Sequence, residues 1–381
     1  MSETQESVGL VGTTGVVQQS SAQVQAIRVA MNASFKERTS EIDVLMTALL
    51  SNEMCFLIGP PGTAKSLICE TLCKSIGGEY FSWLVSKFTT PDEIFGSPSI
   101  EGLKQNRFER VTKNKLPEAH VAFLDEVFKG SSAILNTLLP VINERKFYNG
   151  ATPTKIPLRV LFGASNEIPE AVELGALYDR FTLRVQVNYL KKDASLEDLL
   201  MSTSMGSVPS ITMEQLELEQ QGVQAVQFSQ NMAKLLVTLR NLAAAEGIEI
   251  SDRKMKKSVG VLKAYSYLNG RQEVCEEDLV ILENVFWDTP DQIKTLKRII
   301  NKVSNPIGEQ LMKITDSVQE VFEGLEKNTI DPSSGIKKVK AAIQSLQKLG
   351  DVSKNPKLKK AIEEAQNTQR KIIKQFLDLE D

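Results

Sequence analysis

The segment that constrains this fold most is a glycine-rich turn, whose residues are Gly59, Pro60, Pro61, Gly62, Thr63, Ala64, Lys65 and Ser66. It follows a short apolar run, residues 54–58, and leads into residues 65–76, whose apolar spacing predicts a helix. A buried strand, such a turn and a helix form a P-loop, in which backbone N–H groups and the helix N-terminus surround phosphates. A chance turn is the alternative, but it would not bring strand, loop, lysine-serine pair and helix together.

Two side chains of this turn carry the expected chemistry. Lys65 would reach the β- and γ-phosphates of ATP, and Ser66 would bind Mg²⁺. Leu67, the next residue of the helix, belongs to the predicted nucleotide-binding residues as well. Ala64 departs from the usual pattern, which has glycine before the lysine, and alanine is unfavourable there if the position needs a positive φ.

The run VAFLDE, residues 121–126, predicts the second half of the same site. Its first four residues read as a buried strand, and Asp125 and Glu126 follow at the carboxyl end, where open α/β sheets bind ligands. Asp125 would hold Mg²⁺, directly or through water, and Glu126 would orient and polarise the attacking water. The alternative is a pair of carboxylates that caps a helix or faces solvent.

Apolar strands alternate with helices as far as residue 190, which predicts an α/β domain with a parallel sheet covered on both faces. The expected strands are 54–58, 80–85, 121–124, 159–164 and 183–187, with helices at 65–76 and 133–144. Beyond them the pattern is helical, with Gly247 and Gly270 as expected helix ends. Three amphipathic helices follow Trp287, and the first is expected to carry the apolar stripe Val303, Ile307, Leu311, Ile314 and Val318. We therefore expect a disordered arm at 1–20 with a helix starting near Ser21, an α/β nucleotide-binding domain at 21–190, a linker at 191–224, an all-helical lid at 225–288 and a C-terminal helical bundle at 289–381.

Composition narrows the classes of function. One histidine, His120, and four cysteines in apolar segments make a zinc centre or a Ser/His/Asp catalytic site improbable; we expect the cysteines to be reduced and buried. A net charge of −3 gives no sign of the basic surface that a dedicated nucleic-acid binder needs. Neither a run of eighteen apolar residues nor a secretory signal is evident, so we expect a cytoplasmic protein without a membrane span.

These motifs resemble the MoxR group of AAA+ ATPases, and within it the RavA-like branch. GPPGTAKS, with alanine before the lysine, is similar to that branch's P-loop, and so are LDEVFKGSSAILNTLLPVINERKFYNG at 124–150, GASNEIPE and ALYDRF. The resemblance covers about residues 23–290. It implies an ATP-hydrolysing AAA+ domain with a helix-2 insert, an AAA lid, and assembly into a homo-oligomer, expected to be a hexameric ring.

Further site residues follow from the resemblance, position by position. Asn166 matches the sensor 1 residue that helps to position the attacking water, although an asparagine there can also be an ordinary turn residue. Arg180 matches the arginine finger, which stabilises the transferred phosphoryl group in a neighbouring subunit's site. The alternative role for Arg180 is a surface salt bridge with Asp179 or Glu173.

The lid and the adenine side complete the set. Arg253 matches the sensor 2 arginine of the lid, and whether it serves its own or a neighbouring subunit's nucleotide stays open. Phe35 and the backbone of Lys36 match the family segment beside the adenine. Two insertions resemble those of the clade: residues 88–119, the helix-2 insert, and residues 145–156, a hairpin with an Asn149-Gly150 turn. Two long surface loops are the alternative, but such loops usually serve a function.

The leading hypothesis is a ring-forming, chaperone-like ATPase that uses Mg²⁺ and ATP to remodel or assemble a protein complex. The resemblance fades after about residue 290, so the partner of the RavA branch is not carried over, and the family implies a client-adaptor protein with a von Willebrand factor A domain. The protein client stays unknown. A nucleic-acid translocase and a nucleotide-gated scaffold with little turnover are the alternatives; the acidic charge disfavours the first, and the intact Glu126 and Arg180 disfavour the second.

Overall fold

A computed structural model describes residues 13–150, 152–168, 172–202, 206–304, 306–326, 331–348 and 356–376. The chain divides into two compact units, Met1–Lys297 and Arg298–Asp381. The first helix, α1 (Thr13–Ser34), begins about two turns before the expected position near Ser21. Residues 1–12 of that arm lie outside the described residues.

The first unit is built on a five-stranded parallel sheet with the order β3-β4-β7-β1-β8. The strands are β1 (Cys55–Ile58), β3 (Tyr80–Leu84), β4 (Val121–Asp125), β7 (Val160–Ser165) and β8 (Leu183–Gln186). Every residue of β1 and β7 is buried. Because successive side chains of a strand point to opposite faces, the centre of the sheet is covered on both sides, and the predicted α/β fold is confirmed.

Helices surround this sheet, and one of them also contacts the lid. They include α2 (Thr39–Ser51), α3 (Lys65–Lys74), α6 (Ser132–Glu144) and α7 (Val172–Tyr178). In α2 ten consecutive residues, 41–50, are buried, because the helix packs against β8 on one side and the lid helix α11 on another. A helix that is buried all round belongs to a core, so the lid and the sheet share one.

The two predicted insertions fold and bind to each other. The first contains α4 (Pro91–Phe95), α5 (Ile100–Lys104) and η1 (Leu116–Glu118); the second is the hairpin β5 (Lys146–Asn149) and β6 (Thr152–Lys155). The Asn149 side chain accepts from Arg110 N at 2.6 Å and donates to Arg110 O at 3.1 Å. Phe95 and Phe147 stack with ring centroids 5.6 Å apart. The insertions are therefore not two independent surface loops.

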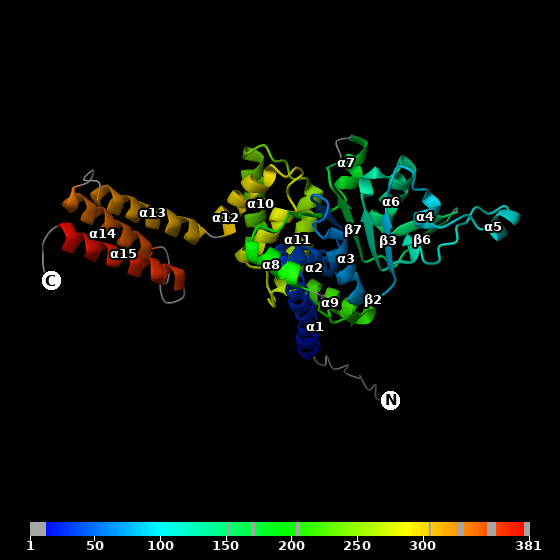
Figure 1. Ribbon diagram of the computed structural model, residues 1–381, viewed down its shortest axis with the longest axis horizontal. Coiled ribbons are helices and arrows are strands. Elements are labelled where there is room, and N and C mark those ends of the chain that lie inside the picture. Colours follow the sequence, from blue (N-terminus) through cyan, green and yellow to red (C-terminus); the bar gives the residue numbers. More distant parts are fainter. Residues whose placement is uncertain are drawn as a thin grey trace, which may run out of the picture. The chain divides into compact units, whose positions relative to one another are not determined.

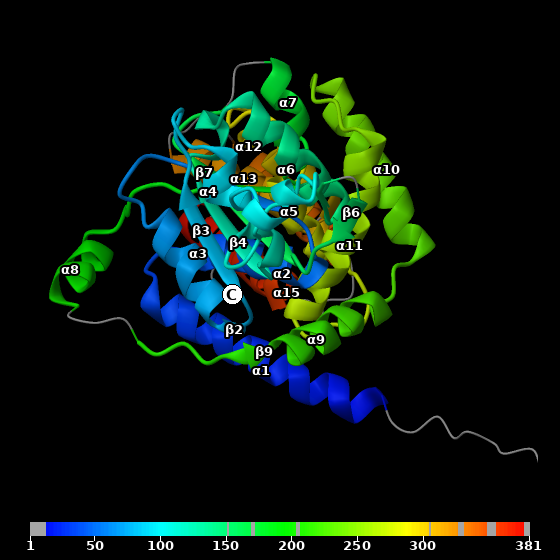
Figure 2. The same cartoon turned by 90° about the vertical axis from the view of Figure 1, so that its right-hand side faces the viewer.

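Residues 191–224 are more than the linker we expected. They form α8 (Asp193–Met201), β9 (Ile211–Thr212) and α9 (Met213–Ala225), and β9 pairs in parallel with β2 (Ile76–Gly77). Helix α9 lies alongside α1, as Figure 2 shows, and buries Leu216 and Val223. Its sequence is rich in Glu and Gln, so only a few apolar residues mark its buried face.

The lid consists of α10 (Gln230–Ala245), α11 (Asp252–Leu268) and η3 (Glu276–Asn284), as the helical pattern predicts. Gly247 and Gly270 follow the first two helices with φ of 76° and 73°, the left-handed conformation that ends helices. Ser251 caps α11 by accepting a hydrogen bond from Lys254 N. Helix α12 (Gln292–Ser304) comes next along the chain.

The second unit contains α13 (Pro306–Glu326), α14 (Pro332–Lys348) and α15 (Pro356–Phe376), which pack side by side around an apolar core (Figure 1). We expected one helix to carry both Val303 and Val318. Instead Val303 belongs to α12 and Val318 to α13, because Pro306 has no N–H to continue a helix and starts a new one.

The minor expectations from composition are mostly met. Cys55, Cys69 and Cys73 are buried free thiols, whereas Cys275 is half-buried at the start of η3 and so differs from the expectation. His120 lies before β4, where its Nδ1 accepts a hydrogen bond from Glu79 N at 3.0 Å. Among the described residues, no helix has the length and apolar character needed to cross a membrane.

Candidate functional site

The glycine-rich turn lies between β1 and α3, at the carboxyl edge of the sheet. Gly62 has φ of 77°, which glycine adopts freely. Ala64 has φ of 64° and ψ of 24°, so the residue that departs from the usual pattern does stand in the left-handed region. For an alanine this conformation costs about 1–2 kcal/mol. Backbone strain of this kind persists only where the surrounding structure holds it, and here the loop leads directly into α3.

Lys65 is folded into this loop. Its Nζ donates to Gly59 O at 2.6 Å, to Pro60 O at 2.9 Å and to Asn166 Oδ1 at 3.1 Å. The residue is only 7% exposed. Burial lowers the pKa of Lys65, while the nearby charges of Asp125 and Glu126 oppose that shift. The present partners of this partly desolvated ammonium group are neutral oxygens, so an anion such as a phosphate would bind it more strongly than they do.

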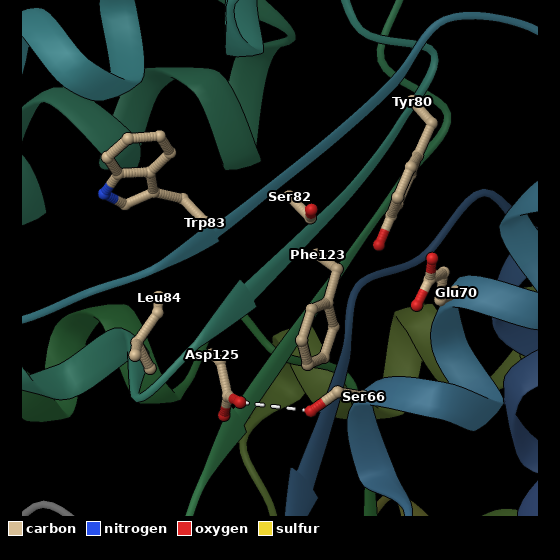
Figure 3. Close-up of a pocket in the computed structure, with 8 residues that line it drawn as sticks. All are labelled: Ser66, Glu70, Tyr80, Ser82, Trp83, Leu84, Phe123 and Asp125. Atoms are coloured by element: carbon tan, nitrogen blue, oxygen red, sulfur yellow. Dashed lines mark hydrogen bonds between the residues drawn. The ribbon is translucent and has the colours of Figure 1, made fainter.

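Ser66 and Asp125 lie next to each other and form the part of the site that fits a metal ion (Figure 3). Ser66 Oγ donates to Asp125 Oδ2 at 3.1 Å, and the pair opens on a groove of about 420 Å³ that β3 borders. The groove is also lined by Glu70, Tyr80, Ser82, Trp83, Leu84 and Phe123. A hydroxyl and a carboxylate are oxygen donors of the kind Mg²⁺ takes together with phosphate oxygens, so the two residues fit that ion.

Glu126 is held in place by neighbours from the sheet. Its backbone has φ of 51°, another left-handed residue, which turns the chain sharply after β4. Its carboxylate accepts from Asn166 Nδ2 at 2.7 Å and from Ser165 Oγ at 3.3 Å, and Lys129 Nζ lies 3.3 Å away. Asn166 therefore bridges Lys65 and Glu126, which is more than an ordinary turn residue does.

A cavity of about 1040 Å³ opens on the other side of the loop. Phe35 and Lys36 line it together with Gly62, Thr63, Ala64 and Leu67, so the expected adenine segment lies beside the P-loop. Helix α8 covers part of the cavity with Leu196, Leu199 and Met201, and Lys36 Nζ pairs with Asp198 at 3.0 Å.

The other loop residues support rather than line this cavity. Gly59 lies against the backbone of Val187, the residue after β8, and Pro61 O accepts a hydrogen bond from Tyr189 at 3.3 Å. The structure thus brings Lys65, Ser66, Asp125, Glu126 and Asn166 together at the ends of three adjacent strands, β4, β7 and β1.

Arg180 and Arg253 line neither this cavity nor the groove beside Ser66 and Asp125. Both contact one carboxylate, that of Asp179, whose Oδ2 is 3.0 Å from Arg253 Nη1 and 3.6 Å from Arg180 Nη1. The local ion pair with Asp179 that we weighed as an alternative is therefore present, while the Glu173 side chain lies outside the described residues. The finding that a lid residue joins it was not predicted.

Three features of the site escaped the sequence analysis. Ser165 and Lys129 contact Glu126; Lys129 stands three residues after it, a spacing that could have suggested the contact. The apolar residues of α8 were assigned to a linker. The pairing of Asp179 with Arg253 joins residues 74 positions apart, and nothing local in the sequence marks it.

Comparison with known protein families gives two matches. Residues 22–227 match the model of the MoxR domain found in MoxR-vWA-beta-propeller ternary systems. Residues 231–300 match an AAA lid domain. The first match covers the sheet, the insertions and α9, and the second covers the helices that follow.

Individual proteins resemble the same region. An uncharacterized protein of Methanocaldococcus jannaschii is 40% identical over 305 residues, 80% of this chain and 80% of its own length. The chaperone MoxR1 of Mycobacterium tuberculosis is 26% identical over 157 residues, 39% of this chain and 40% of its own. A crystal structure of a candidate ATPase from Cytophaga hutchinsonii superposes with a TM-score of 0.62 at 18% identity, over 76% of this chain and 95% of that one; at this identity it supports the fold alone.

Proposed function

Because this chain belongs to the MoxR family of AAA+ ATPases, with an AAA lid after its MoxR domain, we propose that it hydrolyses Mg-ATP to remodel or assemble a protein complex. One observation carries the proposal: Lys65, Ser66, Asp125, Glu126 and Asn166 meet at the carboxyl ends of three adjacent strands. Few other ligands need an ammonium, a hydroxyl-carboxylate pair and a second carboxylate held by an amide in one place.

Each residue of the site then has its own role in ATP binding or hydrolysis. The loop N–H groups and Lys65 bind the phosphates, and Phe35, Lys36 and Leu67 border the space for the nucleoside. Mg²⁺, held by Ser66 and Asp125, would neutralise charge on the phosphate oxygens. Glu126 orients the attacking water and takes its proton. Asn166 holds the Glu126 carboxylate and the Lys65 ammonium at a fixed position relative to each other, because it hydrogen-bonds to both.

The remaining charge of the transferred phosphoryl group would be stabilised by arginine from a second subunit. Arg180 and Arg253 do not line the cavity beside their own P-loop, which supports a role at a neighbouring subunit's nucleotide. We therefore propose that the chain acts as a homo-oligomeric ring, as a hexamer. The assignment to the RavA-like branch stays a prediction that rests on the motif GPPGTAKS, and so does a cytoplasmic location.

The kind of partner follows from the family. The matching model is described from MoxR-vWA-beta-propeller systems, which supports a partner with a von Willebrand factor A domain. The relative from Mycobacterium tuberculosis is named a chaperone, which supports a chaperone-like action on protein complexes.

The test is the ATPase rate of wild type, Lys65→Ala, Glu126→Gln and Arg180→Ala as a function of protein concentration, with the mass in each sample measured by light scattering. Lys65→Ala should lose ATP binding. Glu126→Gln should bind ATP but turn over about 10²–10⁴-fold more slowly, because the base is gone. Arg180→Ala should bind ATP and lose about 10³-fold in turnover, and only in assembled protein.

Lys74→Ala is the matched control for Lys65→Ala, since Lys74 ends the same helix and pairs on the surface with Glu70. It should behave as wild type. Normal turnover by monomeric Arg180→Ala would contradict the ring mechanism. Wild-type protein that binds ATP and assembles with negligible turnover would instead be the nucleotide-gated scaffold.

A further inference from the structure

The carboxylate of Asp179 connects Arg180 of the α/β domain with Arg253 of the lid. Asp179 follows directly after α7 in the α/β domain, and its Oδ2 receives Arg253 Nη1 from the first turn of the lid helix α11 at 3.0 Å. The same oxygen lies 3.6 Å from Arg180 Nη1. Two guanidinium groups that converge without an anion repel each other, so a shared carboxylate is what lets them stand together.

A buried cluster lies next to this carboxylate in sequence and holds both elements. Arg184 of β8 is fully buried; it donates to Asp288 Oδ1 at 2.7 Å and to Tyr178 O at 3.2 Å. Its guanidinium also lies over the Tyr178 ring, 4.1 Å from the centroid. Lys254 of α11 binds the same Asp288 oxygen.

Tyr178 and Lys254 are the chain neighbours of Asp179 and Arg253. The buried cluster therefore fixes the end of α7 and the start of α11 relative to each other, and the Asp179 contacts are built on that rigid base.

The Asp179 contacts themselves contribute little to folding. The side chains of Asp179, Arg180 and Arg253 are 35%, 20% and 48% exposed, and ion pairs at such positions are weak. Among the described contacts of Arg253, the ion pair with Asp179 engages only Nη1. The other N–H groups of this half-exposed guanidinium therefore stay available to an incoming anion.

We propose that Asp179 is a positioning residue, which holds the Arg180 finger and the lid's Arg253 together so that one subunit presents them as a pair to the phosphates of its neighbour's ATP. This inference rests on the proposed ring ATPase. It adds to that ring the carboxylate that pairs the lid's Arg253 with the arginine finger of the same subunit.

The first experiment compares kcat and KM for ATP in wild type, Asp179→Asn, Arg253→Gln and the double variant, at a concentration where wild type is assembled. Asp179→Asn should lower kcat about tenfold or more, because displaced arginines no longer meet the transition state, and change KM less than about twofold. The double variant should lose far less than the product of the two single losses, since Asp179 acts through Arg253. Losses that multiply, or an unchanged kcat in Asp179→Asn, would overturn the proposal.

Two further variants separate positioning from a general structural role. Asp252→Asn removes a neighbouring surface carboxylate of the same helix, which pairs with Arg240, and should keep wild-type turnover. Asp179→Glu keeps the charge and should recover at least part of the turnover that Asp179→Asn loses. Equal loss in Asp179→Glu and Asp179→Asn would contradict the need for a carboxylate here.

Mixed assemblies test the action between subunits. Lys65→Ala subunits keep the arginine pair, and Asp179→Asn subunits keep an intact P-loop, so a mixture should turn over faster than the sum of the separate preparations. A rate equal to that sum would place the arginines at their own subunit's nucleotide and overturn the inference. If wild type itself neither assembles nor hydrolyses ATP, the proposed function fails first, which is a different result.

Discussion

Gly59 is a position where adding a single methyl group should lower the free energy of unfolding strongly. A Cβ at residue 59 would lie 2.0 Å from Val187 O, whereas an ordinary contact begins at 3.4 Å, so one of the two backbones must move by about 1.4 Å. Neither atom belongs to a side chain that could rotate away. The amide of Val187 also donates to Ile58 O at 2.7 Å, which ties β8 to β1 at this point.

These contacts set the expected magnitude for Gly59→Ala. Overpacking that forces a backbone shift costs about 1–3 kcal/mol, and loss of the Val187 hydrogen bond adds about 1 kcal/mol, so the free energy of unfolding should fall by about 3 kcal/mol. Gly59 O is also an anchor of Lys65 at 2.6 Å. A displaced carbonyl should therefore weaken ATP binding as well.

Gly62→Ala is the matched control in the same loop. Gly62 has φ of 77°, but a Cβ there meets no atom within 4 Å. Only the left-handed backbone conformation is unfavourable for alanine, which costs about 1–2 kcal/mol. Urea unfolding of both variants, with and without Mg-ATP, measures the difference. If Gly59→Ala is no less stable than Gly62→Ala, the reasoning from the close approach of the Val187 backbone is wrong.

Two other perturbations follow from buried charges. Asp288→Ala should lower the free energy of unfolding by about 3 kcal/mol, because it leaves the buried cations of Arg184 and Lys254 without their shared carboxylate; a urea midpoint like that of wild type would contradict this. Burial raises the pKa of Glu219, so its contribution to stability is fully present below the unfolded pKa of about 4.3 and is lost as pH rises through the folded pKa. Glu219→Gln should therefore be more stable than wild type near neutral pH, and urea midpoints that do not converge toward pH 4 would refute the assignment.

Much of the fold could be predicted because its signals are local. The strands β1, β4 and β7 are short apolar runs, and the carboxyl ends of parallel strands share one edge, so the meeting of Lys65, Ser66 and Asp125 needed only the pattern and the direction of the sheet. The place of Asn166 in the site came from the family resemblance. The stops at Gly247 and Gly270 likewise follow from what one residue can adopt.

The mistakes lie where local signals are weak. The sequence predicts a linker at α9 because many Glu and Gln residues surround its few apolar ones. Contacts with α1 and α2 bury this narrow apolar face, and they are not visible in the local pattern. The start of α1 was placed too late because residues 13–20 lack a clear apolar period. Pro306 marks the boundary between α12 and α13, because proline has no N–H to continue the hydrogen bonds of a helix.

The sequence by itself determined the chemistry available to this protein: the P-loop, the carboxylates after β4 and the family to which they point, because each depends on residues that are neighbours in the chain. Only the tertiary structure decided how Arg253 of the lid meets Asp179 and Arg180, how Arg184, Asp288 and Lys254 form one buried cluster, and how α8 covers part of the cavity. Those contacts join segments far apart in the chain, and their geometry depends on how whole elements pack rather than on any local pattern.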